Sequence, residues 1–110
     1  MSYKIAAIPN FKKEAKRLIK KFRSLKQELA NLAQILEKNP HTGTPLGINC
    51  YKIRLSIESK QKGKSGGARV ITYVYVENNT VYLLTLYDKS EHEDVTDKDL
   101  KALIKVANAL

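Results

Sequence analysis

The hydrophobic period of this chain changes near residue 40, and that change limits the folds it can form. Between Phe11 and Leu36, apolar residues recur every three or four positions, as they do in amphipathic helices. Asn39-Pro40 ends this region, because proline cannot continue a helix. Ser24 and Gln27 have the spacing of a capping box, which would begin a second helix. The pattern therefore predicts a helical hairpin.

Beyond a proline- and glycine-containing loop at residues 39–49, the pattern becomes that of strands. From Tyr51 to Ile57 apolar and polar residues alternate strictly, which indicates a half-buried strand. Further strands are predicted at residues 68–76 and 81–87, joined by a tight turn. The last of these is apolar at almost every position, so it is expected at the centre of the sheet. Residues 58–67 are polar and glycine-rich and predict a loop.

The two ends of the chain complete the element order. Residues 3–8 are short and apolar and predict a first strand, and Thr96 is placed to cap a last helix with an apolar stripe from Leu100 to Ala107. The order is then β-α-α-β-β-β-α. We expect a single α+β domain over residues 1–110, with an antiparallel meander of three strands and the helices packed on one face. The pattern leaves the place of the first strand open.

Charge is distributed unevenly along the sequence. The net charge is +9, yet the first 69 residues hold 16 basic and 4 acidic residues and the remainder hold 4 and 7. Eight of the basic residues lie between Lys12 and Lys26 on the first predicted helix, with Glu14 as their only acidic neighbour. Such a field favours a polyanionic partner, above all nucleic acid. The alternative is a basic protein whose charged helix face is merely solvated.

Several classes of site and location are disfavoured. Cys50 is the only cysteine, so no internal disulfide can form, and with only His41 and His92 the chain has no set for a cysteine-rich zinc site. The sequence shows neither a signal peptide nor a membrane span, so a cytoplasmic protein without metal or cofactor is expected. An acidic cluster at residues 88–94 is interpreted as a solvated loop, in preference to a cation site.

The strongest candidate for chemistry is a set of cations on the predicted strands. Lys52 and Arg54 alternate with core residues and should project from the face away from the core, and a hairpin would bring Arg69 beside them. Fixed cations of this kind stabilise the charge that develops when an RNA 2′-OH attacks its own phosphate. A lysine whose pKa is lowered by neighbouring cations can act as the base. A basic face that binds phosphates without cutting them is the alternative.

Three segments resemble the RelE/HigB-type toxins of bacterial toxin–antitoxin pairs. They are CYKIRL at residues 50–55, the GKSGG loop at residues 63–67 followed by Arg69, and LLTLYDK at residues 83–89. The resemblance implies a RelE-like α+β fold. It also implies an endoribonuclease that contacts rRNA in the ribosomal A site and cuts the mRNA there. Its products would carry a 2′,3′-cyclic phosphate and a 5′-OH, without a metal. It also implies a cognate antitoxin, often with a helix-turn-helix part that alone contacts operator DNA.

The resemblance also implies roles for individual residues. Lys52 and Arg54 match the basic pair of the family, with Lys52 as the base, and Arg69 matches the arginine that contacts the scissile phosphate. Lys89 would neutralise the same phosphate. The last helix lacks the tyrosine or histidine that often completes the site. The remaining candidates for contact with RNA are Lys62, Lys64, Tyr87 and His92, of which Tyr87 and His92 are the nearest substitutes for the missing acid.

Two other functions stay open at this point. A toxin of the ParE type would act on DNA gyrase through protein contact and would need no cationic site. A non-catalytic RNA-binding module would use the same cations for affinity alone, with a steep dependence on salt.

Overall fold

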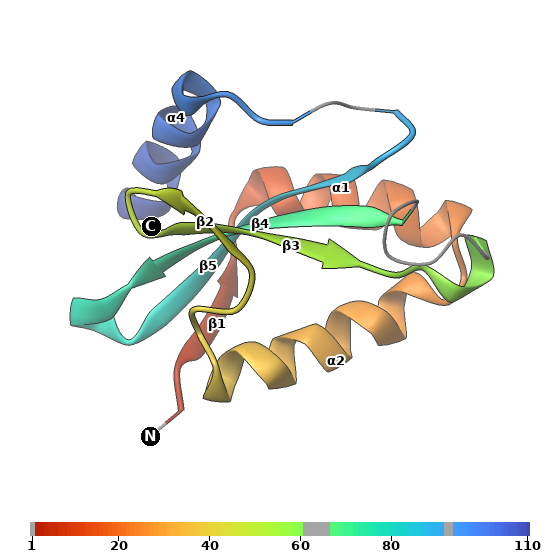
Figure 1. The fold of residues 1–110 in the computed structure, drawn as a ribbon, viewed down its shortest axis with the longest axis horizontal. Helices are drawn as coiled ribbons and strands as arrows, with labels where there is room; N and C mark the ends of the chain where they lie inside the picture. Colours follow the sequence, from red (N-terminus) through yellow and green to blue (C-terminus); the bar gives the residue numbers. More distant parts are fainter. Residues whose placement is uncertain (1, 61–66, 92–93) are drawn as a thin grey trace.

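A computed structural model describes residues 2–60, 67–91 and 94–110 of the chain (Figure 1). The elements in this part are β1 (Lys4–Ala7), α1 (Pro9–Lys21), α2 (Leu25–Lys38), β2 (Thr44–Gly47), β3 (Cys50–Leu55), β4 (Ala68–Tyr75), β5 (Thr80–Asp88) and α4 (Asp97–Asn108). Short 3₁₀ turns follow β3 and β4. The predicted α+β order is confirmed, with one strand added. None of the described helices is both long and apolar enough to cross a membrane.

The strands form one mixed sheet in the order β1-β5-β4-β3-β2. As predicted, β3, β4 and β5 form an antiparallel meander. The N-terminal strand β1 pairs in parallel with β5, with Lys4 opposite Thr80. This pairing gives the first strand its place and leaves β5 in the interior of the sheet, where most of its residues are buried. The prediction of a central, covered last strand is therefore confirmed.

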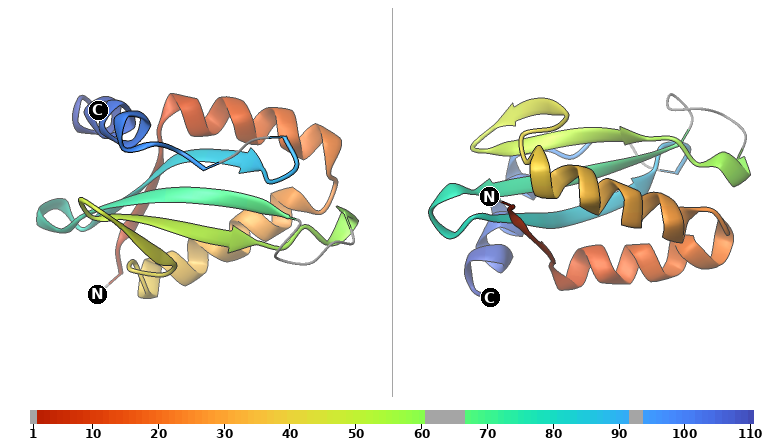
Figure 2. Two further views of the ribbon diagram at one scale, coloured as in Figure 1. Left: turned by 45° about the horizontal axis from the view of Figure 1, so that its top comes forward. Right: turned by 90° about the horizontal axis from the view of Figure 1, so that it is seen from below.

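Helices cover both faces of the sheet, so the expectation that they all pack on one face is wrong. The hairpin of α1 and α2 packs on one face through Leu18, Leu25 and Leu36, against sheet residues that include Val70 and Leu86. On the opposite face, α4 packs with Leu84 and Tyr87 of β5. The right-hand view of Figure 2 shows α2 across the near side of the sheet and α4 beyond it. An amphipathic stripe predicts that a helix is buried but not against which face.

The added strand, β2, lies within the segment predicted to be a loop. It pairs with β3 at the edge of the sheet, where Pro45 is tolerated because an edge strand has backbone groups that need no partner. The turn into β3 places Gly47, Ile48 and Asn49 at positive φ. A proline and three residues at positive φ are typical of a loop, so the sequence pattern does not predict this strand.

The ends of the helices follow the capping rules only in part. The first helix begins at Pro9, two residues earlier than its apolar stripe indicates, because proline suits the first turn of a helix. Ser24 precedes α2 without a side-chain cap, so the predicted capping box is wrong; its hydroxyl donates to Glu28 and accepts from the Ser59 N–H. The predicted cap at Thr96 is confirmed, and with Asp99 it forms a complete capping box.

Candidate functional site

Two arginines lie directly opposite each other on the sheet face that α4 partly covers. Arg54 of β3 pairs with Arg69 of β4, which in turn pairs with Tyr87 of β5. Arg54 is exposed, whereas Arg69 is only 5% exposed and donates from Nη1 to the Ala68 carbonyl oxygen at 3.0 Å. Like charges directly opposite on neighbouring strands destabilise a sheet. Two guanidinium groups in this register are also suited to contact an anion.

A bulge in β5 puts Tyr87 into this row. Ile71 of β4 pairs with Thr85 but the next residue pairs with Leu83, so Leu84 is an extra residue in β5. Tyr82 and Leu84 belong to the core beneath α4, and after the bulge Leu86 belongs to the other core and Tyr87 returns to the α4 side. Bulges often redirect side chains beside functional sites. Without this one, Leu86 would occupy the place of Tyr87.

Lys52 lies on the same face, two residues before Arg54, and is held by a carboxylate. Its Nζ lies 2.9 Å from Oδ1 of Asp94, and the Tyr87 hydroxyl donates to the same oxygen at 3.2 Å. Asp94 thus joins β3 to β5 across the intervening strand β4. The lysine side chain is 22% exposed and the aspartate side chain is 63% exposed, so the contact is at the surface.

The environment sets the protonation of two of these groups. The hydrogen bond from Lys52, supported by its charge and by the Tyr87 hydroxyl, lowers the pKa of Asp94. Burial, followed by the charge of Asp94 and the hydrogen bond to it, raises the pKa of Tyr87 to about 12, against a smaller opposing effect of Arg69. At neutral pH the site therefore holds an aspartate anion and a neutral phenol that still carries its proton.

The other predicted site residues fall partly outside this group. Lys89 is exposed in the turn after β5, where its backbone N–H donates to the Gly67 carbonyl oxygen at 3.1 Å. It is close enough to Asp94 to contribute to the lowering of that pKa. Lys62, Lys64 and His92 lie outside the described residues. The structure thus brings together Lys52, Arg54, Arg69 and Tyr87, with Lys89 at the margin.

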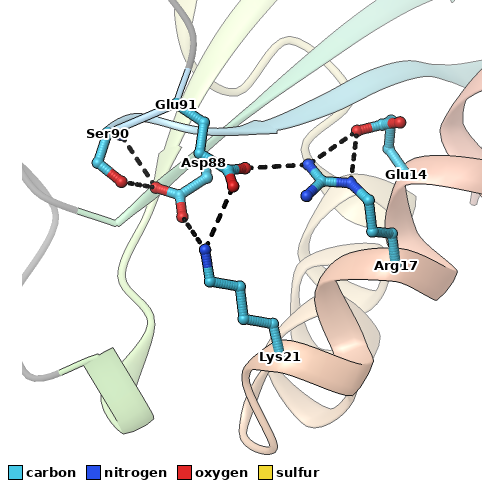
Figure 3. A network of polar contacts seen from close by, with 6 residues as sticks. All are labelled: Glu14, Arg17, Lys21, Asp88, Ser90 and Glu91. Carbon is cyan, nitrogen blue, oxygen red and sulfur yellow. Dashed lines mark hydrogen bonds and ion pairs between the residues drawn. The ribbon is translucent and has the colours of Figure 1, made fainter.

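Asp88, the last residue of β5, and Glu91, which follows it, form ion pairs with α1 (Figure 3). This corrects the prediction of a solvated loop. Arg17 contacts Glu91 at 3.0 Å, and Lys21 contacts Glu91 at 3.2 Å and the buried Asp88 at 3.8 Å. Ser90 donates to Asp88 through both its backbone N–H and its hydroxyl. Part of the positive charge of α1 therefore anchors this segment. Within the residues the structure describes, no acidic or histidine cluster could hold a metal ion.

Asp94 is the site residue that the sequence did not reveal. Residue types alone assign it to an acidic segment, and it is 42 positions from Lys52 in the chain. The sequence does indicate that the last strand ends near Tyr87 and Asp88, a few residues before Asp94. The contact itself depends on the strand order and on the path of the chain into α4.

Together, the mixed sheet, the helical hairpin and the row of cations define a small α+β domain with basic side chains on one sheet face. A family model described as "RelE toxin of RelE / RelB toxin-antitoxin system" matches residues 9–110. The chain belongs to this RelE toxin family. Two solved structures of the Escherichia coli toxin RelE are similar to it in fold, both at 18% sequence identity and covering 96% of this chain. A free-state double mutant gives a TM-score of 0.64 over 97% of its chain, and the isolated toxin gives 0.62 over 99%.

Proposed function

We propose that this protein is the toxin of a toxin–antitoxin pair and that it cuts mRNA on the ribosome as a metal-independent endoribonuclease. The observation that carries the proposal is the cross-strand pair of Arg54 and Arg69, with Lys52 on the same face. Two guanidinium groups and an ammonium group on a rigid sheet suit a phosphodiester, which arginine can contact through two parallel hydrogen bonds. Membership of the RelE family supports the same substrate class.

The proposed reaction breaks one phosphorus–oxygen bond and forms another. The RNA 2′-oxygen attacks the adjacent phosphorus, its proton passes to the unprotonated amine of Lys52, which becomes an ammonium group, and the bond to the 5′-oxygen breaks. Arg54 and Arg69 stabilise the negative charge that grows on the phosphate oxygens, which is commonly the largest catalytic effect. Lys89 adds charge at the margin, and Lys62 and Lys64 remain predicted RNA contacts. The products are a 2′,3′-cyclic phosphate and a 5′-OH.

Tyr87 is the proposed donor of the proton that the 5′-oxygen needs to leave. Its phenol, with a pKa raised to about 12, keeps its proton throughout the physiological range. It is also the ladder partner of Arg69, which places it across β4 from Arg54. Tyr87 therefore replaces the acid that the last helix lacks, and His92 is not required for this role.

The partners follow from the same proposal. The toxin would meet mRNA and rRNA in the ribosomal A site, in the cytoplasm, and a cognate antitoxin would neutralise it. Operator DNA would be contacted only by the antitoxin, through a helix-turn-helix part. The paired segment after β5 leaves Lys12 and Lys16 of α1 exposed for general attraction to RNA or for contact with the antitoxin.

Cleavage on programmed ribosomes tests the proposal. Wild-type protein is expected to cut the A-site codon of the mRNA, and a 2′-deoxy substitution at the scissile nucleotide should abolish cutting. Arg54→Gln and Lys52→Ala are expected to slow cleavage by about 10²–10³-fold. Lys38→Ala, which removes one exposed charge from the last turn of α2 on the other side of the sheet, is the matched control and should cut normally.

Three outcomes would overturn the proposal. Full activity of both Arg54→Gln and Lys52→Ala would show that these cations take no part in the reaction. An absence of cutting by folded wild-type protein, with RNA binding that weakens steeply as salt rises, would instead indicate a non-catalytic RNA-binding module. A gyrase-directed toxin would produce DNA damage in cells without new mRNA 5′ ends.

A further inference from the structure

The Lys52 ammonium group already has an anionic partner in the free protein. Oδ1 of Asp94 lies 2.9 Å from Nζ of Lys52 and accepts a hydrogen bond from the Tyr87 hydroxyl at 3.2 Å. Both distances fall in or near the normal range of hydrogen bonds. One carboxylate oxygen of Asp94 therefore occupies both Lys52 and Tyr87, the two groups that the proposed reaction needs for its substrate.

A non-bridging phosphate oxygen would make the same two contacts. Like a carboxylate oxygen, it carries negative charge, accepts hydrogen bonds and attracts ammonium groups. Two further cations on this face, the guanidinium groups of Arg54 and Arg69, are also suited to a phosphate. While Asp94 is bound to it, the Lys52 side chain is not available to a substrate phosphate.

We propose that Asp94 is an internal occupant of the phosphate site, and that RNA must displace it from Lys52 and Tyr87 before cleavage. This inference rests on the proposed function, since it takes Lys52 and Tyr87 as substrate-binding groups. Asp94 acts as an intramolecular competitor: it screens Lys52 from other anions and lowers the affinity of the free toxin for phosphate. It is a residue that controls binding and not a catalytic residue.

The surroundings of Asp94 support displacement. Its side chain is 63% exposed, so water can solvate the carboxylate once it leaves Lys52. Glu91, three residues before Asp94, is held at α1 by contacts with Arg17 and Lys21. Those two ion pairs do not involve the sheet face, so Asp94 can separate from Lys52 while Glu91 stays in place. An exposed ion pair of this kind contributes little to stability.

Binding measurements with an RNA that cannot be cut test this inference separately from catalysis. A short, fully 2′-O-methylated RNA is titrated into the wild-type protein and into Asp94→Asn, which keeps the shape and loses the charge. Asp97→Asn is the matched control, because it removes the same charge from the exposed first turn of α4, three residues away. We expect Asp94→Asn to bind at least about fivefold more tightly than wild type, and Asp97→Asn to change the affinity by less than twofold.

A second pair of variants tests whether the effect passes through Lys52. In a Lys52→Ala background, adding Asp94→Asn should no longer improve binding. Equal affinities of Asp94→Asn and Asp97→Asn would overturn the inference, as would weaker binding by Asp94→Asn or an improvement that persists without Lys52. Because no step of this experiment requires cleavage, tighter binding by Asp94→Asn in a protein that cuts no mRNA would refute the proposed reaction and leave the internal occupant in place.

Discussion

Replacing Tyr87 with phenylalanine removes the hydroxyl of the proposed acid while preserving the fold. The ring is 5% exposed and packs in the core beneath α4, and phenylalanine would preserve that packing. The lost hydroxyl makes one partly buried hydrogen bond to Asp94, so the expected change in Tm is about 5 °C or less. Loss of a general acid slows a reaction by about 10²–10⁴-fold, which corresponds to roughly 3–5 kcal/mol in the activation barrier. The variant should therefore fold nearly normally and cut very slowly.

Single-turnover cleavage on programmed ribosomes measures this effect. Tyr82→Phe is the matched control: Tyr82 is 7% exposed, belongs to the same core and loses the same atom, but it lies on the other side of the β5 bulge. It should cut at the wild-type rate. An mRNA with sulfur in place of the scissile 5′-oxygen supplies a leaving group that needs no proton. That substrate should restore most of the rate to Tyr87→Phe.

The reasoning fails if Tyr87→Phe cuts normal mRNA at the wild-type rate. It also fails if the slow variant is not rescued by the sulfur substrate, because the hydroxyl would then serve binding or structure and not the leaving group. Wild-type rates should show no loss from deprotonation of Tyr87 between about pH 6 and 9, since burial and Asp94 raise its pKa to about 12.

Two further predictions concern groups away from the reaction. Hydrogen bonds from Arg17 and Lys21 lower the pKa of Glu91, so its ion pairs stabilise the fold at neutral pH, and this small contribution should disappear as the pH falls below about 4. Denaturant unfolding at pH 7 and pH 3 should show Glu91→Gln to be less stable than wild type only at pH 7; an equal loss at both values would contradict the assignment. Burial raises the pKa of Cys50 to about 11, so iodoacetamide at pH 8 should modify the native protein far more slowly than the unfolded chain. Equal rates would show that Cys50 is accessible.

The core of the candidate site was predictable from the sequence because strand periodicity is a local property. Alternation fixes Lys52 and Arg54 on one face, and a hairpin over the intervening loop brings Arg69 to the same face, as the register confirms. The placement of Tyr87 was not predictable in this way. A regular strand would have pointed Leu86 to that face, and only the bulge at Leu84 reverses the alternation.

Features that depend on long-range packing escaped prediction. The stripe of α4 is clear in the sequence, but its choice of sheet face depends on Tyr82, Leu84 and Tyr87 being left uncovered by α1 and α2. Likewise, the salt bridge between Lys52 and Asp94 joins residues whose separation in sequence gives no periodic signal. The sequence indicated a solvated acidic loop at residues 88–94, whereas the structure pairs Glu91 and Asp94 with the protein's own cations.

The parallel pairing of β1 with β5 has a consequence for synthesis of the chain. Lys4 cannot meet Thr80 until the residues between them and Thr80 itself have been made. At about 5–20 residues per second, roughly 4–15 s separate the two strands during translation. In that interval the helical hairpin has no complete sheet to cover, and contacts so distant in sequence form slowly. The candidate site, which includes Tyr87 on β5, is therefore assembled only after β5 has been made.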